Sequence, residues 1–251
     1  MRGYPSVLPR KLSLERINKM PYLEVNFDPF IALAKITGAP ISNPLNLISY
    51  VETIGVGGIG FSYGQEIAPM NNLNLLRSMT NSRINIRVPV DMQVVQKALL
   101  LRPDIITICD PEKSDNTVEI PSKAVKDLVT SIVNIDDVGV ALRLKPEVRQ
   151  MKEAYQMGID EVEVSSNELS EIDKQIPFLE CLEEITHAIR TGNRNSLRVS
   201  VGGALDRRII KAIIEVIDVE FISVGRALLA QSFLKGFEPA VKELTDIIDI
   251  T

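Results

Sequence analysis

Polar side chains that could bind or transform a small substrate recur near the ends of short apolar segments. Glu163 could act as a base if burial raised its pKa. A desolvated Lys145 could form a Schiff base with a keto substrate, although a solvated loop lysine is the ordinary alternative. Three candidate catalytic groups, Glu163, Asp28 and Lys145, are thus joined by four candidate substrate contacts: Asn26, Ser62, Arg87 and Ser200.

Arg87 is the most informative of these residues, because it lies within the alternating segment 84–90. An arginine that points into a protein interior has to be paired, since an unpaired buried charge is very costly. One interpretation is a structural ion pair with Glu163 or Asp28. The other is a clamp for a ligand carboxylate or phosphate, which suits a planar guanidinium. One arginine could serve both purposes.

Two glycine-containing turns near the C-terminus follow two short apolar segments. Gly202 and Gly203 follow residues 197–201, and Gly225 and Arg226 follow residues 220–224. Each pair leads into a helical pattern, whose first backbone N–H groups can hold an anion. The loops after the last two strands of a (β/α)₈ barrel often form a phosphate site. We therefore expect phosphate binding at Gly202, Gly203, Gly225 and Arg226, with ordinary tight turns as the alternative.

Short apolar segments alternate with helical patterns about eight times along the chain, which predicts a single (β/α)₈ TIM barrel over residues 21–251. Residues 1–20 form a basic N-terminal extension, in which 12–20 could be helical. The polar segment 110–117 after the fourth strand is suited to act as a lid. The predicted strands are residues 23–28, 58–63, 84–90, 104–109, 138–144, 161–165, 197–201 and 220–224.

The composition is ordinary for a cytoplasmic globular protein, with a net charge of −5 over 251 residues. This balance offers no electrostatic reason to bind nucleic acid or an anionic membrane. Neither cysteine has the spacing of a metal ligand, so we expect no metal and no cofactor. The one histidine, His187, falls in mid-helix between Ile185 and Ile189, which indicates a structural or surface role.

The order and spacing of seven segments resemble the pyridoxine 5'-phosphate synthase family. The resemblance runs from about residue 22 to residue 243 and implies a (β/α)₈ barrel with added N-terminal helical material. It also implies a homo-oligomer, from a dimer to an octamer, that condenses 1-deoxy-D-xylulose 5-phosphate with 3-amino-2-oxopropyl phosphate. The segments are 25–28, 55–60, Asn85, 111–113, 161–164, 199–202 and 224–227.

The functional residues of that family carry over unevenly. Asn26 and Asp28 match residues that touch substrate, Glu163 matches a glutamate that stabilises a transition state, and Gly202 matches a phosphate contact. The family's acid–base groups do not match. Its third-strand glutamate is Arg87 here, and its histidines or arginines are replaced at Pro29, Thr37, Ser62, Gly64, Pro69, Gly203 and Glu220-Phe221.

This departure favours altered chemistry, because one acid–base group typically contributes about 10²–10⁴-fold in rate. Three hypotheses follow. The first is a diverged transferase- or lyase-type condensing enzyme that acts on a small phosphorylated or carboxylated keto or amino compound. The second is a non-catalytic relative that binds such a ligand or a partner subunit. The third is retained pyridoxine 5'-phosphate synthesis with relocated acid–base groups.

Overall fold

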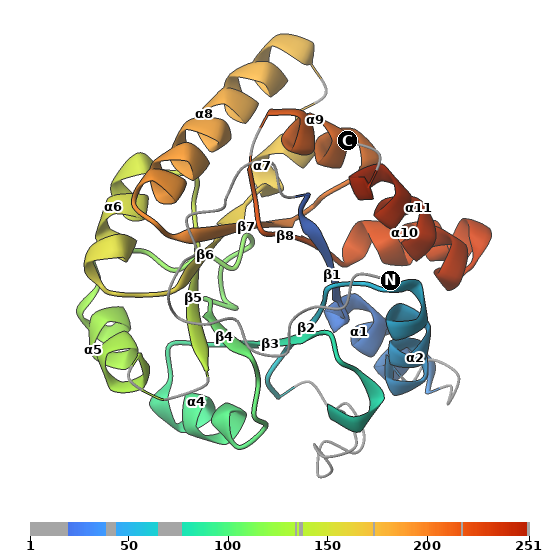
Figure 1. Ribbon diagram of the computed structural model, residues 1–251, viewed down its shortest axis with the longest axis horizontal. Helices are drawn as coiled ribbons and strands as arrows, with labels where there is room; N and C mark the ends of the chain where they lie inside the picture. The colour runs from blue at the N-terminus through green and yellow to red at the C-terminus, as the bar shows by residue number, and fades with distance from the viewer. Residues whose placement is uncertain are drawn as a thin grey trace.

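Eight parallel strands close into one barrel in chain order, from β1 to β8 (Figure 1). The predicted (β/α)₈ fold is thus confirmed. The structure is a computed structural model, and it describes residues 20–38, 44–64, 77–133, 135, 138–172, 174–216 and 218–249. The predicted N-terminal extension lies outside the described residues apart from Met20. The sequence also predicts a helix at 71–79, of which residues 71–76 lie outside them.

The strands match the predicted segments to within two residues at each end, and they pair in parallel throughout. They are β1 Tyr22–Asn26, β2 Gly58–Ser62, β3 Arg83–Val88, β4 Ile105–Ile108, β5 Gly139–Leu144, β6 Glu161–Ser165, β7 Arg198–Gly203 and β8 Phe221–Val224.

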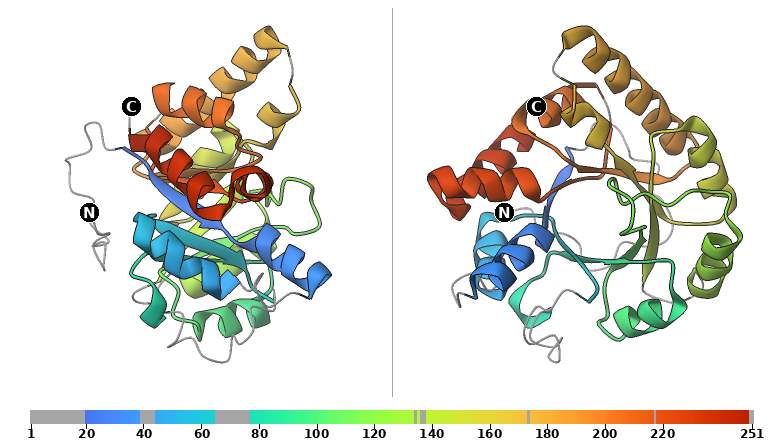
Figure 2. Two further views of the ribbon diagram at one scale, coloured as in Figure 1. Left: turned by 90° about the vertical axis from the view of Figure 1, so that its right-hand side faces the viewer. Right: turned by 180° about the vertical axis from the view of Figure 1, so that it is seen from behind.

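Helices form a ring outside the strands in every view (Figures 1 and 2). Those described are α1 Asp28–Thr37, α2 Pro44–Ile54, α4 Met92–Leu99, α5 Lys123–Ile132, α6 Val148–Gln156, α7 Asn167–Ser170, α8 Gln175–Arg194, α9 Arg207–Val216, α10 Arg226–Lys235 and α11 Phe237–Asp249. None of the described helices is long and apolar enough to cross a membrane.

Three boundaries differ from the prediction. Asp28 belongs to α1 and not to the first strand, because the strand ends at Asn26 and Pro29 suits a helix start. Strand β7 runs through Gly202 and Gly203, which are its last residues and not a turn. The helical region at the C-terminus is divided at Gly236, whose φ of +88° is left-handed and ends α10.

The main apolar core lies between the strands and the helices. Outward-facing residues such as Ile59, Ile86 and Val162 are fully or almost fully buried there. The amphipathic helices cover them, for example through Ile209 and Ile213 of α9. Alternation along each strand then directs the polar side chains to the barrel interior. The barrel interior, and not the apolar layer between strands and helices, therefore holds the side chains that could take part in chemistry.

The carboxyl ends of the strands all lie on one side of the barrel, where active sites of this fold are found. The loop between β4 and α5 extends across the barrel mouth on that side, as the side and rear views in Figure 2 agree. It is anchored from below, because Arg143 Nε donates to the carbonyl oxygen of Asp115 at 2.8 Å and Val118 N–H donates to Arg143 O at 2.9 Å.

Candidate functional site

The barrel interior is filled by a network of ion pairs. Six charged side chains account for all of the buried charges among the described residues, and they comprise equal numbers of arginines and glutamates. Because each charge has an opposite partner, the interior avoids the cost of an isolated buried ion. The six are Glu24, Arg83, Arg87, Arg143, Glu161 and Glu163.

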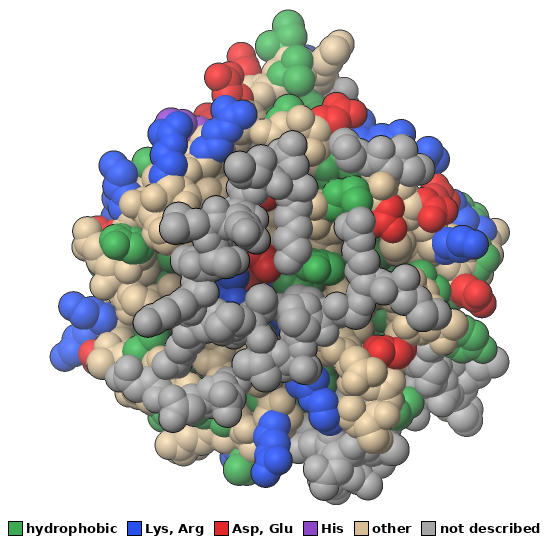
Figure 3. All heavy atoms as spheres, viewed as in Figure 1, with side chains coloured by type: hydrophobic (Ala, Val, Ile, Leu, Met, Phe, Trp, Pro, Cys, Tyr) green, Lys and Arg blue, Asp and Glu red, His purple; other side chains and the backbone are tan. Residues whose placement is uncertain are grey.

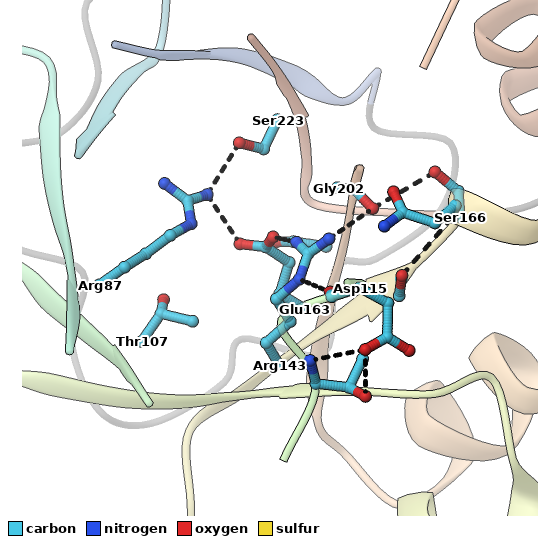
Figure 4. A network of polar contacts seen from close by, with 12 residues as sticks. Arg87, Thr107, Asp115, Arg143, Glu163, Ser166, Gly202 and Ser223 are labelled. Carbon is cyan, nitrogen blue, oxygen red and sulfur yellow. Dashed lines mark hydrogen bonds and ion pairs between the residues drawn. The ribbon is translucent and has the colours of Figure 1, made fainter. Parts of the chain in front are cut away.

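Arg87 is the centre of the upper part of this network (Figure 4). Its Nη2 atom lies 3.0 Å from Glu24 Oε1, 2.9 Å from Glu163 Oε2 and 2.9 Å from Ser223 Oγ. The predicted pair with Glu163 is confirmed, but the second partner is Glu24 and not Asp28. Strand register explains the difference, since Ser223 of β8 lies directly opposite Glu24 of β1 and brings Glu24 toward the barrel axis.

The other terminal nitrogen of Arg87, Nη1, is buried and has no hydrogen-bond partner among the described residues. It points toward Gly60, because a Cβ atom added to Gly60 would lie 2.5 Å from Nη1. A side chain at position 60 would therefore occupy the space that the guanidinium uses. Arg87 therefore keeps one buried donor without a partner among the described residues, packed against the backbone of Gly60.

Glu163 is held from a second side by Arg143, whose Nη1 forms an ion pair with Glu163 Oε1. Arg143 Nη2 also donates to the carbonyl oxygen of Gly202 at 3.4 Å (Figure 4). Gly202 has no room for a side chain, since an added Cβ would overlap Glu163 and lie 2.9 Å from Arg143 Nη1. The Gly202 position is therefore explained by the ion pair beside it.

A lower layer closes the amino end of the barrel. Arg83 bridges Glu161 Oε2 at 2.7 Å and Glu24 Oε2 at 2.9 Å, and its guanidinium stacks 3.4 Å from the Phe221 ring centre. Ser200, a candidate substrate contact, donates to Glu161 Oε1 at 2.6 Å in this layer. Ser200 is thus placed deep in the interior and does not meet the other candidate contacts at the mouth.

The ion network keeps Glu24 and Arg87 ionised. Burial by itself would raise the pKa of Glu24, but Arg87 and Arg83 outweigh it and lower the pKa to about 2. Burial would lower the pKa of Arg87, yet the attraction of Glu163 and Glu24 raises it above its ordinary value. Glu24 and Arg87 are therefore both ionised at neutral pH, which suits structural pairing better than proton transfer.

The end of β1 forms a separate polar cluster at the mouth. Asp28 accepts from the Ser62 backbone N–H at 2.6 Å and from Ser62 Oγ at 2.7 Å. Asn26 Oδ1 accepts from the Asp28 N–H at 2.9 Å. The structure thus brings together Asn26, Asp28 and Ser62, as the sequence predicts, and Asp28 also adds to the attraction that raises the pKa of Arg87.

The ends of β7 and β8 approach each other above Gly202. Asn167 Oδ1 accepts from the Ala204 N–H at 2.9 Å and from Arg226 Nη2 at 3.2 Å. Gly203 has a φ of +134°, and an added Cβ would lie 2.5 Å from Asn167 Oδ1. Glycine is thus required by both the backbone angle and the close contact. Arg226 opens α10, which has no side-chain cap at Gly225.

Other candidate nucleophiles and bases are less suitably placed. Lys145 is exposed near Asp115, so the desolvation that a Schiff-base lysine needs is not present. Cys109 lies near Arg87 and Glu163, but burial raises the pKa of its thiol to about 11. His187 is exposed on α8, as predicted. No group of His, Cys, Asp and Glu in the described part of the chain could hold a metal ion.

Four contributors to the site were missed by sequence reasoning. Arg83 lies on the same strand face as Asn85 and Arg87, so the alternation contained a usable signal. Ser223 shares the inward strand face with Phe221 and alternates with the apolar Ile222 and Val224. Thr107 donates to Asn85 Oδ1 at 2.8 Å from within an apolar strand. Asn167 had no local signal, because its partners lie 37 and 59 residues further along the chain.

A closed barrel of eight parallel strands with polar groups at its carboxyl end is the architecture of (β/α)₈ barrel proteins. The family model described as "Pyridoxal phosphate biosynthesis protein PdxJ" matches residues 23–250. The chain therefore belongs to this family, as the sequence resemblance implied.

Relatives from several bacteria align over almost their whole length. A protein named pyridoxine 5'-phosphate synthase from Syntrophotalea carbinolica is 22% identical over 236 residues, which cover 91% of this chain and 99% of the relative. One from Geotalea daltonii is 24% identical over 236 residues with the same coverage. The identity is low, so individual site residues have to be compared one at a time.

Solved structures of other enzymes share the fold. A monomeric form of phosphoribosylanthranilate isomerase from Thermotoga maritima has a TM-score of 0.60 at 11% identity and covers 92% of this chain and 100% of its own. An (S)-mandelate dehydrogenase has a TM-score of 0.59 at 12% identity and covers 91% and 73%, respectively. These likenesses support the barrel fold alone.

Replacing Arg87 with methionine should lower the free energy of unfolding by about 3–5 kcal/mol, because Glu24 and Glu163 would lose a buried cation. Urea denaturation measures this. Arg77→Met is the matched control, since Arg77 pairs with Asp104 at 2.7 Å but is 41% exposed. The control should cost about 1 kcal/mol or less. An Arg87→Met protein as stable as the wild type would contradict the structural role.

The stability of the protein should fall in acid. A carboxyl group whose pKa is lowered on folding stabilises the protein above its ordinary pKa, here 4.5, and loses that contribution as the pH falls toward about 2. Glu24 should account for a contribution on the order of 3 kcal/mol over that range. Urea denaturation of the wild type between pH 5 and pH 2 measures it.

Glu24→Gln should show a weaker dependence on pH across this window than the wild type does. The exposed Glu112 provides the control, Glu112→Gln, which should keep the wild-type dependence. Equal slopes for the wild type and Glu24→Gln would show that Glu24 is not held ionised by the network.

Proposed function

We propose that this chain binds a small phosphorylated keto or amino compound at the mouth of its barrel and processes it by altered condensation or cyclisation chemistry. The phosphate group is held at the ends of β7 and β8, by the Gly202–Ala204 backbone and by Gly225 and Arg226. The remainder of the ligand lies over Arg87 and the cluster of Asn26, Asp28 and Ser62. Glu163 and Asp28 are the candidate catalytic groups.

One observation carries this proposal. The position of the family's third-strand glutamate is Arg87, and Arg87 forms a buried ion pair with Glu163 at 2.9 Å. Arg87 and Arg143 thus engage both carboxylate oxygens of Glu163, so this side chain is better placed to stabilise positive charge than to move protons. The chain's single histidine is exposed on α8 and offers no substitute.

The charge balance of the interior also bears on the ligand. The buried arginines and glutamates are equal in number, and Asp28 adds a further carboxylate near Arg87. A ligand carboxylate beside Arg87 Nη1 would place excess negative charge in a dry site, which is costly. A phosphate at the exposed Arg226 meets a solvated cation instead. The charge balance of the interior therefore favours a phosphate bound at the ends of β7 and β8 and an uncharged hydrogen-bond acceptor of the ligand beside Arg87.

Pyridoxine 5'-phosphate synthesis is the second candidate, because the family match extends over nearly the whole chain and the named relatives carry out that function. It would require acid–base groups other than the histidines at the positions that differ here. A non-catalytic subunit that binds the same ligand is the third possibility, and the closed ion network is compatible with it.

A homo-oligomer is part of the proposal. Hydrophobic side chains gather at the tip where α8 begins, seen at the top of Figure 3, and Ile176 there is 71% exposed. On α10, Phe233 is 69% and Leu234 is 86% exposed beside an apolar groove of about 180 Å³ that Phe30, Leu47 and Phe237 line. Exposed apolar area of this kind is typical of subunit contacts.

The direct test is an assay with 1-deoxy-D-xylulose 5-phosphate and 3-amino-2-oxopropyl phosphate, with pyridoxine 5'-phosphate detected by mass spectrometry. We expect turnover at least 10⁴-fold below that of an authentic family enzyme run beside it, because several acid–base groups are lost together. Ordinary turnover would overturn the proposal of altered chemistry and establish the second candidate.

Native mass spectrometry of freshly purified protein supplies the accompanying measurement. It should reveal a phosphorylated compound retained by the wild type and lost from Arg226→Gln, and it also counts the subunits. A ligand without phosphorus would contradict the proposed phosphate site, and a monomer at micromolar concentration would contradict the oligomer.

A further inference from the structure

The side chain of Asn167 occupies the position at which the proposed phosphate site would bind its anion. Asn167 Oδ1 accepts from the Ala204 N–H at 2.9 Å and from Arg226 Nη2 at 3.2 Å. These are a backbone donor at the end of β7 and a guanidinium at the start of α10. Both would be expected to donate to a phosphate oxygen.

The position of the Asn167 oxygen is tightly defined. Gly203 lies directly beneath it, since a Cβ added to Gly203 would be 2.5 Å from Oδ1 and 3.2 Å from Ser166 Oγ. Ser166 is fully buried and donates to Gly202 O at 3.3 Å, which holds the start of α7 against β7. The amide oxygen therefore rests on the same glycine surface that a bound anion would need.

The amide nitrogen of Asn167 makes a third connection. Nδ2 donates to the carbonyl oxygen of Ser114 at 3.4 Å, in the loop that crosses the barrel mouth. The loop is also attached to the interior through Asp115 O and Arg143 Nε at 2.8 Å. One half-buried side chain thus joins the loop after β4, the end of β7 and the start of α10.

We propose that Asn167 is a specificity-determining residue that acts as an internal competitor for the anion. In the unliganded protein its amide oxygen satisfies Ala204 and Arg226, and a phosphate displaces it on binding. A neutral amide oxygen yields to a phosphate, because hydrogen bonds to a charged acceptor are about twice as strong. Weakly charged ligands do not displace it, so the site selects for phosphate. This inference rests on the proposed phosphate site.

Two substitutions at position 167 should change the affinity for phosphate in opposite directions. Asn167→Ala removes the competing oxygen, so phosphate affinity should rise about tenfold, the equivalent of about 1.4 kcal/mol. Asn167→Asp keeps the shape but adds a carboxylate that pairs with Arg226 and repels the anion. Its phosphate affinity should fall at least tenfold, and the difference from the wild type should shrink as salt is added.

The experiment measures the binding of inorganic phosphate to the full chain by isothermal titration calorimetry at constant ionic strength. The proteins are the wild type, Asn167→Ala, Asn167→Asp and Arg226→Gln. Thermal melting without phosphate is recorded for each. A purely structural Asn167 would lower stability without raising affinity, whereas a competitor lowers stability and raises affinity together.

The four proteins distinguish the phosphate site from the competitor role of Asn167. If Arg226→Gln weakens phosphate binding but Asn167→Ala does not strengthen it, the phosphate site stands and the competitor role is wrong. If Arg226→Gln leaves binding unchanged, or no protein binds phosphate, the phosphate site is wrong and the competitor role falls with it. If Asn167→Ala fails to fold, equal binding by Asn167→Asp and the wild type would still overturn the inference.

Discussion

The structure depends on the balance of charge inside the barrel. Three arginines and three glutamates are buried there, and each forms an ion pair with a partner on a different strand. Moving one such ion from water into a protein interior costs several kcal/mol, so the network has to be assembled as a unit. Arg87 is the clearest example, because its Nη2 atom binds Glu24, Glu163 and Ser223 from three different strands.

The barrel fold could be predicted because its signal is local and repeated. Each strand alternates over a few residues and each helix has its own apolar face, so β6 Glu161–Ser165 was predicted to the residue. Boundaries were less certain where two elements adjoin. Asp28 continues the alternation of β1, yet it is the first residue of α1 and precedes a proline that suits a helix start. Gly202 and Gly203 resemble a turn in sequence, but pairing with β6 and β8 extends β7 through both residues.

The site could be predicted only in part, because its contacts join distant segments. The inward direction of Arg87 and Glu163 followed from alternation, and their pairing followed from the cost of buried charge. The choice of Glu24 over Asp28 did not, since it depends on strand register around the closed barrel. Asn167 shows most clearly what the sequence could not predict. Nothing near it in the sequence indicates that its oxygen contacts Ala204 and Arg226.

The buried ion network and the proposed β7–β8 phosphate site lie at two distinct levels, one inside the barrel and one at its mouth. The lower level is charge-balanced and bound by fixed partners, which favours a structural role for most of the interior. The upper level has exposed or half-buried donors that a single asparagine satisfies. Membership of the family accounts for the barrel. The departure at Arg87 and Gly203 from the family's acid–base groups stays a prediction from the sequence resemblance.

A crystal structure of the wild type soaked with inorganic phosphate would test this division into two levels most directly. We expect phosphate density beside the Ala204 N–H and Arg226, with the Asn167 amide displaced and Arg87 still paired with Glu24 and Glu163. Phosphate bound to Arg87, with its pair to Glu163 broken, would contradict it.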